Sequence, residues 1–155
     1  DKMHALGVIP SFFATHIYFW GDRHWAIFLG PERTRRLNPC RSAMIRKMPF
    51  TCHNDAYVTP IDPMLSVWAA VNRISKQGRV IGQKFRVPVI EALRSVTCYA
   101  AYQNHEEQFK GTLAPGKFAD LTILEDNPLT IDPIAIKDIR VSATVVGGNT
   151  IFGDI

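Results

Sequence analysis

The hydrophobic pattern changes period near Gly111, and this change constrains the fold more than any other feature of the chain. Before it, short apolar runs typical of buried strands alternate with stretches whose apolar residues recur at helical spacing. After it, apolar side chains alternate with mostly polar ones over residues 139–146, the period of a half-buried strand, and Gly147-Gly148-Asn149 predicts a hairpin turn. We therefore predict an α/β fold in two parts: a partial parallel barrel over residues 1–108 and a small β segment over residues 109–155.

The expected elements of both parts follow from apolar spacing and from the positions of glycine and proline. Residues 1–6 should be the last turn of a helix closed by Gly7. Residues 17–30 are rich in aromatic side chains and contain Gly21, and we expect a long loop there. Strands are predicted at residues 8–13, 48–55, 119–124 and 139–146, and helices at residues 31–37, 40–47, 64–76 and 89–102, with Pro88 at the first helical position of the last.

Composition places the chain among ordinary globular proteins. Of its 155 residues 46% are hydrophobic and 21% charged, and the formal charge of +4 is spread along the chain rather than gathered on one face. We therefore expect no nucleic-acid partner, although a basic binding domain for acidic partners is an alternative. Three widely spaced cysteines fit neither a disulfide framework nor a Cys-x-x-Cys zinc site, which favours a reducing, cytoplasmic location. The chain contains no apolar run of about 18 residues, so the sequence predicts no membrane span.

Asp55 is the strongest candidate for catalysis. Side chains alternate faces along a strand, so Thr51, His53 and Asp55 should share one face of the strand at residues 48–55. If Phe50 and Cys52 face the helices, Asp55 points into the barrel at the carboxyl end of its strand, where barrel enzymes keep catalytic groups. A carboxylate at this position is suited to bind zinc and to accept a proton. The sequence alone, however, favours the simpler alternative that Asp55 caps the turn before Ala56.

His16 follows the predicted strand at residues 8–13, so it should lie at the same carboxyl-end rim of the barrel as Asp55. A neutral imidazole there is a good zinc ligand, and an ordinary loop histidine is an equal alternative. His4, His24 and His105 are expected to be solvated residues without a role in the site. We expect Asp22 and Arg23 to form a salt bridge in the loop, and a contact with substrate is the alternative that we favour less.

Several segments together resemble the C-terminal third of a metal-dependent amidohydrolase of the YtcJ-like, amidohydrolase-3 type, related to N-substituted formamide deformylases. Their order and spacing carry the resemblance, since each fragment alone is weak. The segments are Leu6-Gly7-Val8 with Pro10-Ser11 and His16, Trp20-Gly21-Asp22-Arg23, Leu29-Gly30-Pro31-Glu32-Arg33, His53-Asn54-Asp55, Ala70-Val71-Asn72-Arg73, Glu91-Ala92-Leu93-Arg94, Thr97-Cys98-Tyr99-Ala100-Ala101-Tyr102 and Lys110-Gly111-Thr112-Leu113-Ala114-Pro115-Gly116-Lys117-Phe118-Ala119-Asp120.

The resemblance implies a TIM-type barrel whose C-terminal part lies in this chain, followed by a small β-sandwich segment. It implies one or two divalent metal ions, zinc being expected, and hydrolysis of a non-peptide carbon–nitrogen bond by a metal-activated water. Asp55 matches the family's acid/base aspartate and a metal ligand, and His16 a second metal ligand. His53, Trp20 and Arg23 are the expected contacts of a small amide-like substrate. Asn54 stands where the family usually has Ser or Thr, and should face away from the site.

No histidine of the chain stands in the His-x-His pair that the family uses for its first metal ligands. We therefore expect this chain to be a fragment that is inactive without the missing N-terminal part of the enzyme. Half a barrel should expose strand edges and an apolar face, which predicts association with that part or with other copies of the chain. The alternative is a catalytically inactive, self-associating scaffold module.

Overall fold

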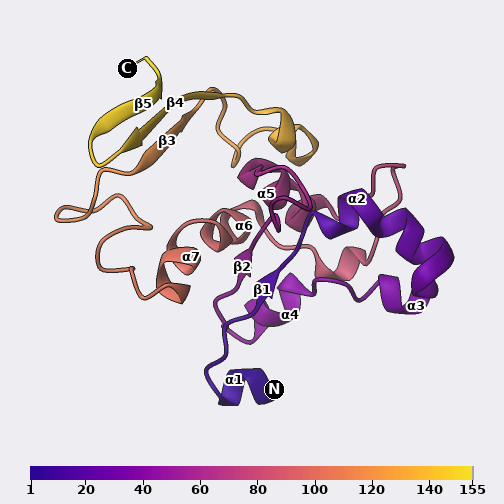
Figure 1. Cartoon of the computed structure of the whole chain (residues 1–155). Coiled ribbons are helices and arrows are strands. Elements are labelled where there is room, and N and C mark those ends of the chain that lie inside the picture. The colour runs from indigo at the N-terminus through magenta and orange to yellow at the C-terminus, as the bar shows by residue number, and fades with distance from the viewer. Residues whose placement is uncertain (155) are drawn as a thin grey trace.

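The structure is a computed structural model that describes residues 1–154, so Ile155, the end of the predicted β segment, lies outside the described residues. Figure 1 shows two short central strands surrounded by helices, with a separate sheet near the C-terminus. The helices are α1 (Lys2–Ala5), α2 (His16–Arg23), α3 (Gly30–Thr34), α4 (Cys40–Ile45), α5 (Pro63–Asn72), α6 (Val89–Ser95) and α7 (Cys98–Gln103). The strands are β1 (Ser11–Phe12), β2 (Thr51–Cys52), β3 (Leu121–Leu124), β4 (Val141–Val146) and β5 (Asn149–Gly153). A π-helical turn, η1 (His24–Phe28), continues α2, and η2 (Gln83–Phe85) and η3 (Pro133–Asp138) are 3₁₀ helices.

Strands β1 and β2 pair in parallel, as the alternation of strands and helices predicted. The Thr51 N–H donates to the Pro10 carbonyl at 3.0 Å, and the His53 N–H donates to the Phe12 carbonyl at 3.0 Å. Both strands are shorter than the apolar runs that predicted them. Because the strands are parallel and adjacent, the residues that follow Phe12 and Cys52 leave the sheet at the same edge.

The loop predicted at residues 17–30 is wrong, because this segment forms α2 and η1. Gly21, which suggested a loop, lies buried inside α2. A Cβ atom at Gly21 would lie 2.4 Å from Cδ1 of Ile81, so the glycine allows the helix to approach the chain around Ile81. Tertiary packing therefore outweighs the low helix propensity of glycine at this position.

Helix α5 lies at the centre of the core, and eight of its ten residues are buried. Asp62 caps its first turn by accepting a hydrogen bond from the Leu65 N–H at 2.9 Å, and Pro63 occupies the start of the helix. The helix ends at Asn72 rather than at Lys76, because Arg73 adopts a left-handed conformation with φ of 55°.

The single helix predicted at residues 89–102 is wrong, because the chain divides there into α6 and α7. The break is at Thr97, whose φ and ψ are −127° and −100°. Two hydroxyls bond to helix carbonyls next to the break, Ser95 to Ala92 at 2.6 Å and Thr97 to Leu93 at 2.8 Å. Such side-chain bonds compete with the backbone ladder of a helix. Pro88 precedes α6 as its cap instead of standing at the first helical position.

The C-terminal part contains an antiparallel sheet in the order β3-β4-β5 (Figure 1). Ala143 and Val145 are buried whereas Ser142 is exposed, which confirms the predicted alternation. Gly147 and Gly148 both have positive φ, as the predicted hairpin turn requires. Among residues 109–154 there is one sheet of three strands, so a second layer of a sandwich is not present in the described part of the chain.

Helix η3 joins the two parts of the molecule by packing on α5. The indole N–H of Trp68 donates to the Ile134 carbonyl at 2.8 Å, and the Asn72 amide donates to the Pro133 carbonyl at 2.8 Å. Ile136 is fully buried in the main core cluster. The three cysteines are free, and no helix within residues 1–154 is long and apolar enough to cross a bilayer.

Candidate functional site

Aromatic and histidine side chains gather beyond the carboxyl ends of β1 and β2. Phe13, directly after β1, stacks on His16 with ring centroids 5.1 Å apart. Phe13 also stacks on His53, directly after β2, at 5.3 Å. Trp20 completes the group, with its ring 5.2 Å from His16 and 5.8 Å from Phe13. The structure thus brings together three of the five predicted site residues: His16, His53 and Trp20.

His16 forms a pair with His24, which the sequence placed in solvent. Their Nε2 atoms lie 3.0 Å apart, and the rings meet edge to face. Nδ1 of His24 is buried and has no hydrogen-bond partner. The expectation that His24 is an ordinary solvated residue is therefore wrong, because it is half-buried against His16. The spacing His16, Trp20, His24 repeats every four residues, and this signal is visible once the segment is read as a helix.

Burial favours the neutral form of both paired imidazoles. Desolvation lowers the pKa of His16 most, the neighbouring His24 lowers it further, and the charge of Asp55 opposes both effects. Desolvation also lowers the pKa of His24. A neutral imidazole has a free nitrogen lone pair, which is the form that binds a metal ion or accepts a proton.

Asp55 lies in an exposed turn beyond β2 rather than on the strand itself. The strand ends at Cys52 and Asp55 has φ of 50°, so the alternation used to orient Asp55 does not extend to it. Its carbonyl accepts a hydrogen bond from the Val58 N–H at 2.6 Å. The charge of Asp55 raises the pKa of His16, although burial and His24 lower it more. Asn54 donates to the Asp62 carbonyl at 3.0 Å and so braces the start of α5.

Arg23 lies at the exposed end of α2, with its guanidinium 5.5 Å from the ring centre of Phe28. The predicted Asp22–Arg23 salt bridge is wrong, because consecutive residues of a helix point in different directions. Asp22 instead accepts from Nε of Arg79 at 3.3 Å and from the Gln77 N–H at 3.2 Å.

A buried arginine that the sequence reading overlooked holds the loops behind this cluster. Arg73 is fully buried and donates to the carbonyls of Leu37 at 2.6 Å, Asn38 at 2.7 Å and Ile81 at 2.8 Å. Asn38 in turn donates from its side-chain amide to the Phe13 carbonyl at 2.7 Å. This chain of bonds fixes the backbone at the end of β1, where Phe13 contacts both His16 and His53.

The cluster has metal-binding chemistry but an incomplete set of ligands. Imidazole and carboxylate are the usual ligands of zinc, so His16 and Asp55 are of the right type. No group of three or more His, Cys, Asp or Glu side chains within residues 1–154 is placed to hold a metal ion. A catalytic zinc site needs three protein ligands. The described residues therefore do not by themselves form such a site.

Comparison with known proteins identifies relatives of the whole chain. The model of the amidohydrolase family Amidohydro_3 matches residues 1–152. YtcJ of Bacillus subtilis strain 168, which is named as an amidohydrolase, is 28% identical over 151 residues. That match covers 96% of this chain and 28% of YtcJ, so the chain spans less than a third of this relative.

Solved structures with a similar fold include two hydrolases. An uncharacterized metal-dependent hydrolase from Pyrococcus horikoshii OT3 is 25% identical with a TM-score of 0.70, over 85% of this chain and 27% of that one. An amidohydrolase from Thermotoga maritima MSB8 is 16% identical with a TM-score of 0.55, over 74% of this chain and 26% of that one, a likeness of fold alone. Since the family model extends over nearly the entire sequence, the chain belongs to the amidohydrolase family.

Proposed function

We propose that the chain supplies the last part of the active site of a metal-dependent hydrolase acting on non-peptide, amide-like carbon–nitrogen bonds. The observation that carries this proposal is the gathering of His16 and His53 around Phe13 beyond the carboxyl ends of two adjacent parallel strands. Barrel enzymes keep their catalytic groups at this edge. The family membership of the chain supports the same reaction class.

The residues of the cluster have separate roles in this proposal. His16 and Asp55 would hold a divalent ion, zinc being the proposed metal, and that ion would supply the activation of a water molecule. The Asp55 carboxylate takes up the proton released during attack on the amide carbon and passes it to the leaving nitrogen. Phe13 and Trp20 form an aromatic wall, while His53 and Arg23 contact the substrate. The lowered pKa of His16 keeps its imidazole available as a ligand at neutral pH.

The other ligands are proposed to come from outside this chain, which spans 28% of the length of YtcJ. The surface is consistent with a covering partner, because β1 and β2 form a sheet of only two strands within the described residues. Several large apolar side chains are more than half exposed, among them Leu6, Ile61, Leu113 and Ile151. We propose that the remainder of the enzyme, a second copy of the chain, or both cover these surfaces.

The test is the variant Asp55→Asn in the complete enzyme, with Asp126→Asn as the control. Asp126 is also an exposed loop aspartate, but it lies between the β3 strand and η3 rather than beyond β2. We expect Asp55→Asn to lower kcat/KM for N-formyl and N-acyl amines by about 10²-fold or more, the usual effect of losing a general acid–base group. Metal content should fall as well, while the thermal midpoint stays unchanged. Retention of activity within about threefold would refute the assignment of Asp55.

A self-associating scaffold without catalysis is the second candidate. The exposed apolar side chains and the absence of a three-ligand cluster within residues 1–154 favour it. Metal analysis and size-exclusion chromatography of the same preparation distinguish the two functions. A metal-free oligomer without hydrolase activity supports the scaffold, and a metal-loaded active species supports the hydrolase.

A further inference from the structure

His16 and His24 meet through the same atom of their rings. Their Nε2 nitrogens lie 3.0 Å apart, which is a hydrogen-bond distance, and the ring centroids are 4.5 Å apart. Residues eight positions apart are separated by about 12 Å along a regular helix. Both rings therefore lean toward each other along α2 and η1, and such a contact forms only where packing holds both of them.

The packing around the pair holds each ring in place. Phe13 stacks on His16 with an angle of only 4° between the ring planes, and the Trp20 ring lies 5.2 Å from His16. The edge of Phe28 meets His24, with ring centroids 5.7 Å apart. The helix also widens into the π-helical turn η1 at His24 itself, and π-helical turns are frequent at functional sites. The contact between the histidines is thus a feature that several elements support.

The direction of the hydrogen bond follows from the other nitrogen of His24. A bond between two imidazoles needs a proton on one nitrogen and a lone pair on the other. If His16 were the donor, a neutral His24 would carry its own proton on Nδ1, which is buried and has no partner. A buried N–H group without an acceptor is rarer in proteins than an acceptor without a donor. His24 therefore donates its Nε2 proton to Nε2 of His16.

This direction of the bond fixes the state of the His16 ring. Its lone pair lies on Nε2 and is occupied by His24, so a neutral His16 carries its proton on Nδ1. Within residues 1–154, Nδ1 of His16 has no hydrogen-bond partner in the protein and is not one of the buried unpartnered atoms, so it is accessible. A metal ion needs a nitrogen without a proton. The nitrogen of His16 that suits a metal is thus the one that His24 covers.

We propose that His24 competes with the metal ion for Nε2 of His16. It occupies this nitrogen in the metal-free protein and is displaced from it when the ion binds. The inference rests on the proposed role of His16 as a metal ligand. His24 keeps its proton during the displacement, so a hydrogen bond is exchanged for a coordinate bond and no proton is transferred. His24 thereby lowers the affinity for the metal while it holds the His16 ring in one orientation.

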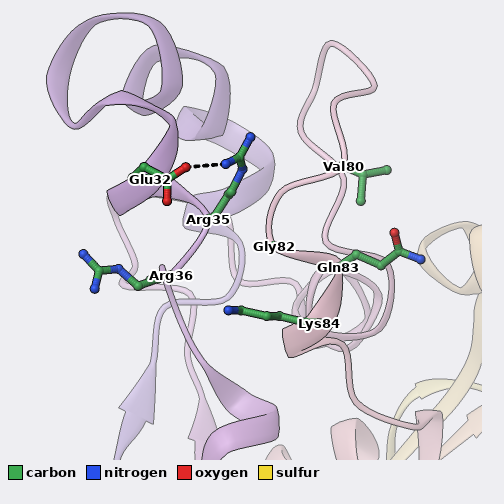
Figure 2. Close-up of a pocket in the computed structure, with 7 residues that line it drawn as sticks. All are labelled: Glu32, Arg35, Arg36, Val80, Gly82, Gln83 and Lys84. Carbon is green, nitrogen blue, oxygen red and sulfur yellow. Dashed lines mark hydrogen bonds and ion pairs between the residues drawn. The ribbon is translucent and has the colours of Figure 1, made fainter.

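A hollow on another part of the surface does not share these properties. Figure 2 shows it between the end of α3 and η2, with Glu32 as the single carboxylate of its lining and no histidine. Glu32 forms an ion pair with Arg35. Imidazole, thiolate and carboxylate groups are the ligands of zinc. Zinc binding that depends on His16 or His24 therefore reports on the histidine pair rather than on this hollow.

The first test is the zinc affinity of the complete enzyme, measured by competition with a chelating indicator. His24→Phe retains a ring that can pack against Phe28 but removes the donor. His24→Gln keeps an N–H group near the position of Nε2 and should restore the competition. His4→Phe is the matched control, because His4 is an exposed histidine of α1 outside the cluster.

We expect His24→Phe to bind zinc about tenfold more tightly than the unchanged enzyme, which corresponds to about 1.4 kcal/mol and to the loss of one hydrogen bond. His24→Gln should stay within about threefold of the unchanged enzyme, and His4→Phe within about twofold. A merely structural role of His24 predicts the opposite sign, since a loosened site binds zinc more weakly. Unchanged or weaker binding by His24→Phe would overturn the proposal.

The second test reads the hydrogen bond itself, by NMR of the metal-free enzyme labelled with [¹⁵N]histidine. We expect His16 to carry its proton on Nδ1, and His24→Phe to let that proton exchange between both ring nitrogens. A His16 signal that is the same in both proteins would overturn the assigned bond. If His16→Phe leaves zinc affinity unchanged, the proposed metal role of His16 is wrong and the competition with it, whereas the NMR result still decides on the hydrogen bond.

Discussion

Replacing Arg73 with glutamine should strongly destabilise the protein. The guanidinium is fully buried and donates at 2.6, 2.7 and 2.8 Å to three backbone carbonyls, those of Leu37, Asn38 and Ile81. Glutamine offers one shorter, uncharged amide with two N–H donors, so at least one of these carbonyls loses its donor and any bond that remains is weaker. Each bond from a charged group is worth about 1.5–3 kcal/mol, and relief of the desolvation of the charge offsets part of the loss. We therefore expect the free energy of unfolding to fall by about 3 kcal/mol.

Urea denaturation monitored by tryptophan fluorescence measures this change, and a loss of about 3 kcal/mol corresponds to a decrease of roughly 6–12 °C in the thermal midpoint. Burial lowers the pKa of Arg73 to about 10, so the side chain is still charged at neutral pH. Arg73→Lys keeps this charge but lacks the planar fork, and it should rescue little of the stability. The exposed Arg41→Gln is the control and should change stability by less than about 0.5 kcal/mol. A loss below about 1 kcal/mol for Arg73→Gln would refute the role of its three bonds.

Three further predictions follow from backbone and pKa features. Gly82→Ala should cost more than about 3 kcal/mol because its Cβ would meet the Arg35 carbonyl oxygen, whereas Gly78→Ala, with φ of 84° and open space around it, should cost only about 1 kcal/mol in thermal unfolding. Because the pKa of His24 is lowered in the folded protein, the unfolded chain binds more protons, so stability should fall as pH drops through about 6.5 and level off below the folded pKa. His24→Gln should reduce that fall in urea titrations between pH 8 and pH 5, and an unchanged profile would exclude His24 as its source. Asp62→Ala should destabilise the protein by about 1 kcal/mol through loss of the α5 cap, and a neutral result would contradict the capping role.

Features governed by local chemistry could be predicted from the sequence. The hairpin at Gly147 and Gly148 needs positive φ, which glycine supplies, and the alternation in β4 shows which side chains are buried. The parallel strands β1 and β2 follow from apolar runs separated by helical stretches. Consequently, the sequence also located the end of the sheet where His16 and His53 both stack on Phe13.

Features governed by tertiary contacts could not be predicted in the same way. Gly21 indicates a loop by its propensity, yet it is helical because Ile81, sixty residues later, needs the space that a side chain would fill. Because a loop was predicted at residues 17–30, the helical spacing that places His24 beside His16 was not recognised. Likewise, Arg73 looks like a surface residue at the end of a helix until the carbonyls of Leu37, Asn38 and Ile81 are known.

The bonds of Arg73 also brace the proposed hydrolase site. Through Asn38 the guanidinium positions the Phe13 backbone, and with it the ring that stacks on His16 and His53. Through Leu37 and Ile81 it ties the chain after α3 to the chain before η2. A change at Arg73 should therefore weaken hydrolysis as well as folding stability.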